Sequence, residues 1–395
     1  MTHAGATCPS PNTEAFRALF LLRGDIAFLN HGSFGACPKA VFDRYQRWQR
    51  ELVHQPVEML AQSRSFDTRM REAREALAGY LGVHRDSIVY HDNSTTALNQ
   101  VARSLPLQPG DEIVGTDHEY GAVEKTWNFV AERRGATYVR TPIEVPLTTP
   151  ERIVEQLWSR VTSRTRVISV CHVTSATALT FPVKAICARA RAEQIITVID
   201  GAHAPAYLDL DLADIDPDFY AGNCHKWLCA PKGTAFLYAR PDRQALLEPL
   251  IVSWGWRSER ASGSRFIEES EYRGTRDISA SLTVPAAIAF QRAHAWDRVR
   301  ASCQALADET ATRITTLTGL APLAPPTRDW TGQMRGLPLP ACDVERVKRR
   351  LYDDHGVELP VYRWNDQPLL RISVQGYNTP NDLDRLLDAL PRVLG

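Results

Sequence analysis

The sequence predicts an α/β fold, in which a large domain with a mostly parallel sheet flanked by helices is followed by a smaller α+β domain. Between about residues 88 and 240, short β-branched runs alternate with apolar residues at helical spacing, which is typical of β-α-β units. After residue 281, the pattern is helix, strand, helix and strand pair. A chain of 395 residues is long enough for two domains. We expect an N-terminal arm at 1–24, a large domain at 25–280 and a small domain at 281–395 that includes part of the N-terminal segment.

The composition excludes several classes of partner. The 46 Lys and Arg residues balance 46 Asp and Glu residues, so no charge favours nucleic acid or an acidic membrane. The eight cysteines form no CxxC motif and no disulfide framework, which fits reduced thiols. No apolar run reaches the length of a membrane span, and the first residues lack a signal-peptide pattern. We expect a soluble cytoplasmic protein without a metal site.

The N-terminal part combines helices with one polar turn. We expect a short helix at 14–22 after Pro9 and Pro11, and longer helices at 38–54 and 63–81. Between them, the segment FLNHGSFG exposes Asn30 and His31 at a strand exit. These residues are either ordinary turn residues or ligands of a site.

Two strand-to-helix joints come next. The strand at 88–90 leads into a helix through Ser94, Thr95 and Thr96, and a phosphate can bind at such a helix start. The same residues could serve only as helix caps. The second joint, GDEIVGTDHEYGA, places His118 and Tyr120 before a helix that we expect at 125–134, followed by a strand near 137–140.

The central stretch, 195–233, contains the pair of residues that suggests the chemistry. A β-branched strand ends at Asp200, and Lys226 follows the next strand, near 219–220. Pyridoxal phosphate requires such a pair, because the lysine forms the Schiff base and the carboxylate keeps the pyridine nitrogen protonated. Without further context the two residues would be a solvated ion pair.

Five sequence motifs provide the context for this pair, namely DGAHAP, HKW, NHGSFG, DHEYGA and GTRD. In this order they resemble the class V aminotransferase and cysteine desulfurase-like group of fold type I pyridoxal phosphate enzymes. Within that group, the motifs are most similar to those of the isopenicillin N epimerases and their relatives. The resemblance extends from about Asn30 to Asn378.

The resemblance implies a role for each matching residue. Lys226, Asp200 and His203 would contact the cofactor, and Ser175 would bond its phenolic oxygen. Its phosphate would be held by the following residues: Thr95, Thr96, Asn223, His225 and, from the neighbouring protomer of a homodimer, Thr275. Tyr120 or His118 would stack on the ring and serve in acid–base chemistry. Arg371 would bind the substrate carboxylate, with Asn30 and His31 nearby. Ala178 and Ala206 stand where the family usually has glycine.

The desulfurases of this group need a cysteine shortly before the carboxylate-binding arginine, and the segment at 355–370 has none. We therefore expect proton abstraction at the α-carbon of an amino acid. Epimerisation is the first expectation, and a C–S β-lyase, as in the ergothioneine-pathway lyases, or an aminotransferase is the alternative. A non-catalytic relative is disfavoured, because Lys226 and Asp200 are intact.

The C-terminal third completes the expected structure. The segment at 250–281 is expected to be a loop that crosses to a second subunit. A helix at 284–299, continuing through 317, a strand near 331–337, a helix at 343–355 and a strand pair around LLRISVQGYNT are expected to follow.

Overall fold

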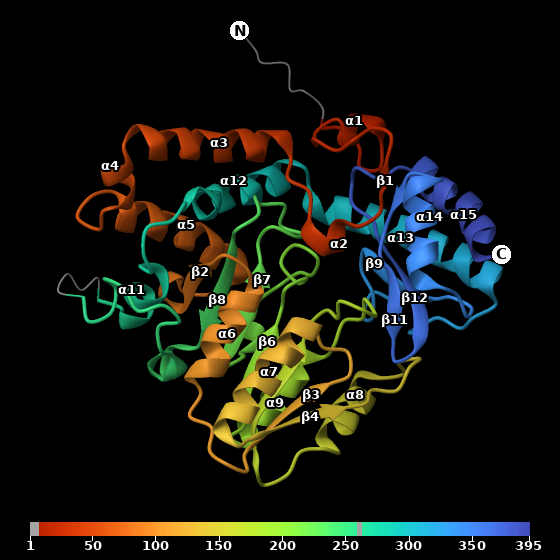
Figure 1. The fold of residues 1–395 in the computed structure, drawn as a ribbon. Coiled ribbons are helices and arrows are strands. Elements are labelled where there is room, and N and C mark those ends of the chain that lie inside the picture. The colour runs from red at the N-terminus through yellow and green to blue at the C-terminus, as the bar shows by residue number, and fades with distance from the viewer. Residues whose placement is uncertain (1–7, 259–262) are drawn as a thin grey trace.

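A computed structural model describes residues 8–258 and 263–395 (Figure 1). Residues 1–7 of the predicted arm and 259–262 of the predicted crossing loop lie outside the described residues. The main sheet has seven strands in the order β2-β8-β7-β6-β5-β3-β4, and only β8 runs antiparallel to its neighbours. The strands are β2 (Ile88–His91), β3 (Glu112–Thr116), β4 (Thr137–Thr141), β5 (Thr165–Cys171), β6 (Ile196–Asp200), β7 (Phe219–Asn223) and β8 (Ala235–Ala239). The predicted α/β fold is confirmed.

Helices cover both faces of this sheet, because its strands are apolar on both sides. In β6, Val198 packs in the core beneath α6 and α7, whereas Ile199 belongs to the core of the opposite face. Within the described residues, no helix has the length and apolarity needed to cross a membrane. The helices up to residue 293 that follow the N-terminal turn are α3 (Lys39–His54), α4 (Pro56–Leu60), α5 (Phe66–Leu81), α6 (Ser94–Ser104), α7 (Gly121–Arg134), α8 (Pro150–Trp158), α9 (Val183–Ala192), α10 (Leu212–Ile215), α11 (Arg265–Glu271) and α12 (Ser279–Ala293), with 3-10 turns at Arg85–Ser87 and Pro241–Leu246.

A second, antiparallel sheet of order β11-β12-β9 lies beside the large one (Figure 1). Its strands are β9 (Met334–Pro338), β11 (Val361–Trp364) and β12 (Gln367–Ser373), accompanied by the helices α13 (Trp296–Thr318), α14 (Val344–Asp353) and α15 (Pro380–Leu394). The N-terminal α1 (Glu14–Arg17) precedes β1 (Ala27–Phe28), which pairs in parallel with β10 (Val357–Glu358). Asn30 forms a bridge to Ser373. The short helix α2 (His31–Phe34) is therefore held between the N-terminal segment and β12.

Three predicted elements differ from the structure. The helix expected to run from 284 through 317 is two helices, because Ala295 adopts a left-handed conformation with φ of 46° that no α-helix accommodates. The helix expected at 14–22 ends at Arg17, and the expected loop at 250–281 contains α11. Apolar periodicity continues on both sides of Ala295, so spacing alone does not reveal the bend.

Candidate active site

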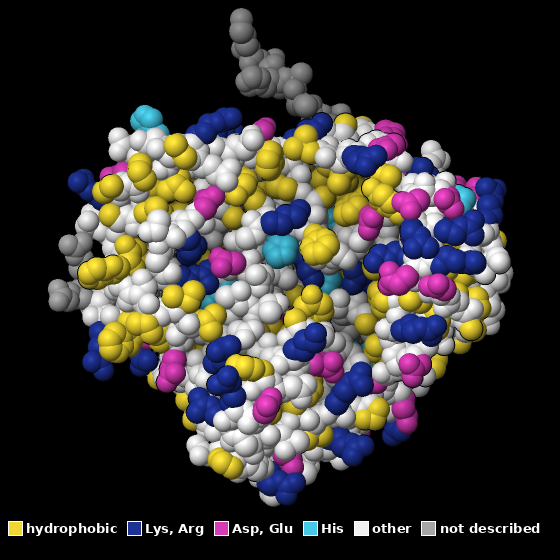
Figure 2. Space-filling model, in the orientation of Figure 1, with side chains coloured by type: hydrophobic (Ala, Val, Ile, Leu, Met, Phe, Trp, Pro, Cys, Tyr) yellow, Lys and Arg dark blue, Asp and Glu magenta, His cyan; other side chains and the backbone are white. Residues whose placement is uncertain are grey.

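The carboxyl ends of the parallel strands β5 and β6 and the loop after β7 form one pocket. Asp200 is the last residue of β6, and its register partners are Cys171 on β5 and Ala221 on β7. Figure 2 shows a hollowed region near the middle of this face of the molecule, beside histidine and hydrophobic side chains. The predicted site residues that line the pocket are Thr95, Tyr120, Ser175, Asp200, His203, Asn223, His225 and Lys226.

Lys226 and His203 lie in contact, with 3.0 Å between Nζ and Nε2. The indole N–H of Trp227 donates to His203 Nδ1 at 3.3 Å, so a neutral His203 carries its proton on Nε2 and donates it to Lys226. A lysine amine can accept that bond only when it is neutral. Burial lowers the pKa of Lys226 to about 8, with Arg371 acting in the same direction and Asp200 opposing it. Lys226 therefore lies in a setting that favours a nucleophilic amine.

Asp200 is buried and lines the same pocket as Lys226 and His203. Its Oδ1 accepts the backbone N–H of Ala202 at 2.9 Å, and the thiol of Cys171 lies 3.9 Å from Oδ2. Burial raises the pKa of Asp200, while the Ala202 hydrogen bond lowers it, as does Lys226 when it is protonated. A second cation close to Oδ2 would stabilise the carboxylate.

The start of α6 lies at the pocket, as expected for an anion-binding candidate, although a different residue caps the helix. Asn93 is the cap, since its Oδ1 accepts the backbone N–H of Thr96 at 2.9 Å. Asn223 Oδ1 accepts the backbone N–H of Ser94 at 2.9 Å. Thr95 lines the pocket, whereas Thr96 does not. The buried Ser94 Oγ has no hydrogen-bond partner among the described residues.

His225 completes this side of the pocket. Its Nδ1 lies 3.2 Å from the carbonyl oxygen of Thr234, to which it donates, and this leaves Nε2 as the ring nitrogen available to a ligand. Burial lowers the pKa of His225 to about 4. An anion bound beside it would raise that pKa.

Arg371 on β12 faces the site from the second sheet. Its Nη1 donates to the carbonyl of Ser175 at 2.6 Å and to Ser175 Oγ at 3.2 Å, and Nη2 donates to Ser33 Oγ at 2.8 Å. Arg371 is only 4% exposed, and its Nε has no partner among the described residues. No carboxylate of the described chain forms an ion pair with it. A buried guanidinium without a counter-ion is costly, so this arginine is suited to an anionic ligand.

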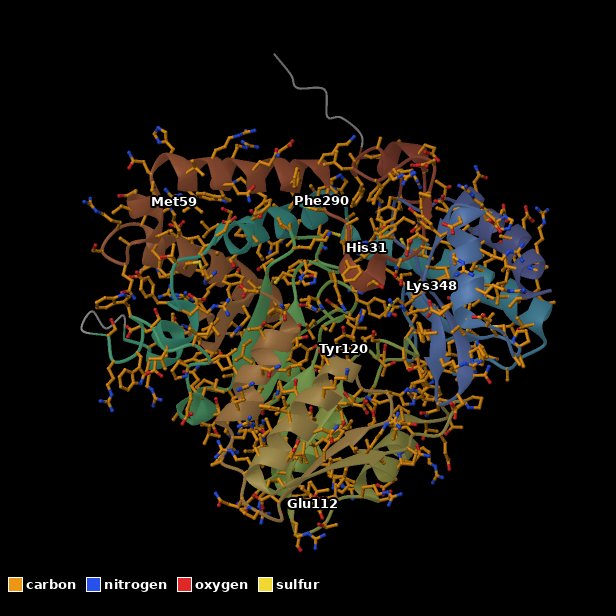
Figure 3. The ribbon with its side chains drawn as sticks, viewed as in Figure 1. His31, Met59, Glu112, Tyr120, Phe290 and Lys348 are labelled. Atoms are coloured by element: carbon orange, nitrogen blue, oxygen red, sulfur yellow. The ribbon has the colours of Figure 1, made fainter. Side chains whose placement is uncertain are left out.

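The structure places the two other candidate substrate ligands behind the pocket. His31 Nε2 lies 3.1 Å from the carbonyl of Lys226, and its Nδ1 lies 3.0 Å from the hydroxyl of Tyr377. His31 is fully buried, so it supports the lysine loop and does not line the pocket. Asn30 Oδ1 accepts the hydroxyl of Ser33 at 2.5 Å and reaches Arg371 only through that serine. Figure 3 shows His31 on α2 and Tyr120 below it, before α7.

Tyr120 and His118, the two candidates for stacking, are clearly separated. Tyr120 is 48% exposed and lines the pocket, whereas His118 is fully buried and does not. The His118 ring packs 4.5 Å from that of Trp364. The geometry therefore does not bring His118 to the site. Thr275 is exposed beside Trp254 in a groove elsewhere on the surface and does not line this chain's pocket.

Sequence reasoning missed Ser33 and Asn93. Ser33 lies within the NHGSFG segment, two residues after His31, but only the fold shows that its hydroxyl accepts a hydrogen bond from Arg371. Asn93 could have been found, because an Asn immediately before Ser-Thr-Thr is a strong capping signal.

The pocket fits pyridoxal phosphate. Buried Lys226 and Asp200 line the same pocket as the start of α6, where the hydroxyl of Ser94 has no hydrogen-bond partner among the described residues. Within the described ranges, no group of His, Cys, Asp or Glu is placed to hold a metal. Fold and pocket together define a pyridoxal phosphate enzyme of fold type I.

Comparison with known proteins identifies the family. The aminotransferase class-V family model matches residues 33–386, and the chain belongs to this family. The isopenicillin N epimerase of Amycolatopsis lactamdurans is 38% identical over 92% of this chain and 94% of its own length. An L-cysteine desulfhydrase of Arabidopsis thaliana is 27% identical, covering 93% of this chain and 88% of that protein. The solved structure of the cysteine desulfurase CsdA from Escherichia coli matches with a TM-score of 0.80 at 23% identity, covering 96% and 98% of the two chains. The protein is a pyridoxal phosphate-dependent enzyme, as predicted.

Proposed function

We propose that this enzyme removes the α-proton of an amino acid and returns it on the opposite face, as an amino-acid epimerase. The observation that supports the proposal most directly is Arg371, a buried cation whose hydrogen bonds go to neutral groups. Its unpartnered Nε–H and an Nη2–H lie on one edge of the guanidinium plane, which is the donor pair that a carboxylate accepts. A bound α-carboxylate would fix the amino acid between Arg371 and Lys226.

Lys226 is proposed to be the base. Its lowered pKa and the hydrogen bond that it accepts from His203 favour an amine with a free electron pair at Nζ. Asp200 and the start of α6 would hold the two ends of pyridoxal phosphate, with Ser94, Thr95 and His225 around the phosphate. When bound, the cofactor supplies an electron-poor ring that stabilises negative charge at the α-carbon.

Epimerisation also requires an acid on the face opposite the base. Tyr120 is the candidate, since its hydroxyl-bearing ring lines the pocket and belongs to a different loop from Lys226. The 38% identity to an isopenicillin N epimerase over nearly the full length of both chains supports this reading.

A C–S β-lyase is the second candidate, and the similarity to an L-cysteine desulfhydrase favours it. In both reactions Lys226 would take the α-proton, and the lyase would in addition release a sulfur group from the β-carbon. A protein thiol nucleophile is not part of either proposal. The cysteine that lines the pocket, Cys171, is buried, and burial raises its pKa far above the usual range.

The proposed assembly is a homodimer with shared sites. Thr275 is exposed, and beside it Val57 and Trp254 are 66% and 82% exposed on the same groove. Exposed apolar side chains that share one groove are typical of an interface between subunits. Thr275 would reach the phosphate in the partner's pocket.

The proposal is tested by proton NMR in heavy water with the cofactor-loaded enzyme and L-alanine, L-methionine, S-methyl-L-cysteine and S-methyl-L-cysteine sulfoxide as probes, of which the last two carry sulfur on the β-carbon. Epimerisation predicts loss of the α-proton signal together with formation of the D-isomer. Release of pyruvate or another elimination product would assign the enzyme to the lyases instead. No α-proton exchange with any probe, in enzyme that shows the cofactor's visible absorbance, would count against both.

A further inference from the structure

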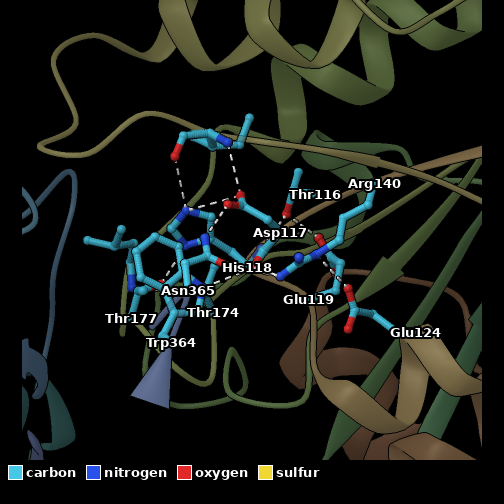
Figure 4. Close-up of polar contacts among 12 residues, drawn as sticks. Thr116, Asp117, His118, Glu119, Glu124, Arg140, Thr174, Thr177, Trp364 and Asn365 are labelled. Atoms are coloured by element: carbon cyan, nitrogen blue, oxygen red, sulfur yellow. Dashed lines mark hydrogen bonds and ion pairs between the residues drawn. The ribbon is translucent and has the colours of Figure 1, made fainter. Parts of the chain in front are cut away.

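A polar cluster outside the pocket joins two parts of the chain that are far apart in sequence (Figure 4). Asp117 follows β3, and its Oδ2 accepts the side-chain N–H of Asn365 at 2.6 Å. The backbone carbonyl of Asp117 accepts the indole N–H of Trp364 at 2.9 Å. The turn between β11 and β12 is thereby attached to the loop that leads to Tyr120.

Further hydrogen bonds fix the orientation of both side chains in the contact between Asp117 and Asn365. Asp117 is 8% exposed, and its Oδ1 accepts the backbone N–H of Ile143 at 2.9 Å, so both carboxylate oxygens are occupied. Asn365 Oδ1 accepts Nη2 of Arg140 at 3.2 Å, which directs its amide nitrogen toward Asp117. A buried, fully paired carboxylate resists rearrangement, because an unpaired one would be costly.

A third segment, residues 174–177, closes the cluster. His118 Nδ1 lies 2.7 Å from Thr177 Oγ1, and the Tyr362 hydroxyl donates to the carbonyl of Ala176 at 2.5 Å. Ser175 in the same segment accepts the two hydrogen bonds from Arg371 Nη1. The carboxylate-binding candidate is therefore connected to Asp117 through the strand on which it lies and through the loop that holds its guanidinium.

We propose that Asp117 and Asn365 are positioning residues, whose contact sets the separation between Tyr120 and Arg371. Tyr120 follows Asp117 by three residues, and Arg371 follows Asn365 by six along the hairpin. When the contact is broken, only the bond from the Trp364 indole to the Asp117 carbonyl still joins the turn directly to the Tyr120 loop within the described residues, so the hairpin and its arginine are held less firmly against that loop. The kinetic consequence rests on the proposed function, since it assumes that Arg371 binds the amino-acid carboxylate.

The chain offers a matched pair of variants for the test. Asn365 and Asp366 both have positive φ, 44° and 65°, so glycine is accepted at either position. Only the side chain of Asn365 bonds to Asp117. In the cofactor-loaded enzyme with L-methionine, Asn365→Gly should raise KM by about tenfold with kcat within about twofold, because a misplaced carboxylate site weakens binding. Asp366→Gly should match the wild type.

Hydrogen–deuterium exchange gives a readout that needs no turnover. Backbone amides of residues 117–120 and 361–373 should exchange faster in Asn365→Gly than in Asp366→Gly. Exchanging the two side chains provides a rescue experiment. In Asp117→Asn alone, the amide nitrogens of two asparagines face each other and no hydrogen bond forms between them. In the double variant Asp117→Asn with Asn365→Asp, an amide donor again faces a carboxylate acceptor. The double variant should recover the wild-type exchange rates and KM.

The inference is overturned if Asn365→Gly and Asp366→Gly have the same amide exchange, or if the double variant behaves no better than Asp117→Asn. Absence of turnover in the wild-type enzyme would contradict the proposed function only, because the amide-exchange comparison decides the positioning contact independently.

Discussion

Replacing Arg371 by methionine should separate activity from stability. Methionine has a similar length but no charge. The variant loses three hydrogen bonds to neutral groups, which destabilises it, but it also avoids the free-energy cost of burying a charge. These effects oppose each other, and we expect the free energy of unfolding to change by less than about 2 kcal/mol. The loss of two charge-assisted hydrogen bonds to a substrate carboxylate, about 1.5–3 kcal/mol each, should lower kcat/KM by at least about a hundredfold.

Arg74 is the matched control. It is also buried, with a side chain 7% exposed, but it is paired with Glu271. Arg74→Met should cost about 3–5 kcal/mol of unfolding free energy, because it leaves a buried carboxylate without its partner. Both variants are compared by denaturant unfolding without cofactor and by α-proton exchange. The reasoning is refuted if Arg371→Met loses as much stability as Arg74→Met, or keeps kcat/KM within about tenfold of the wild type.

Three further predictions concern the lysine, the partner subunit and pH. Lys226→Ala should abolish α-proton exchange while still binding pyridoxal phosphate through its phosphate, as measured by dialysis and absorbance; full activity would remove Lys226 from the mechanism. Thr275→Val should weaken cofactor binding, and mixing it with Lys226→Ala should restore some activity in mixed dimers, which a site contained in one chain could not show. Burial lowers the pKa of His172 from 6.5 to about 3, so between these values the unfolded state binds a proton that the folded state does not. The contribution of His172 to the free energy of unfolding should therefore fall by about 1.4 kcal/mol per pH unit as the pH falls from 6.5 toward 3, and His172→Asn should reduce the slope of stability against pH by that amount.

The sequence by itself predicted the layered architecture, because burial on both faces leaves a readable signal. The apolar runs that became β5, β6 and β7 are continuous, as a two-sided parallel sheet requires. The same logic placed Asp200 and the loop that carries Lys226 at one edge of the sheet, since the carboxyl ends of neighbouring parallel strands meet there, whereas their pairing around a cofactor was implied by the motifs DGAHAP and HKW.

Other parts depended on contacts that no local pattern encodes. The sequence could not show that Ala295 bends the helical region, because its neighbours on both sides keep helical spacing. It also could not distinguish Thr95 from Thr96, because which threonine lines the pocket depends on how the start of α6 packs against the distant loops after β6 and β7.

The sequence thus determined the fold class, the family and the pair formed by Asp200 and Lys226. Only the tertiary structure separated Tyr120 from His118, since two residues so close in the chain were brought to opposite sides of one loop. It also showed Arg371 without an acidic partner, which depends on residues more than a hundred positions apart. Local sequence encodes periodicity and burial, whereas the contacts of a side chain depend on which distant segments fold against it.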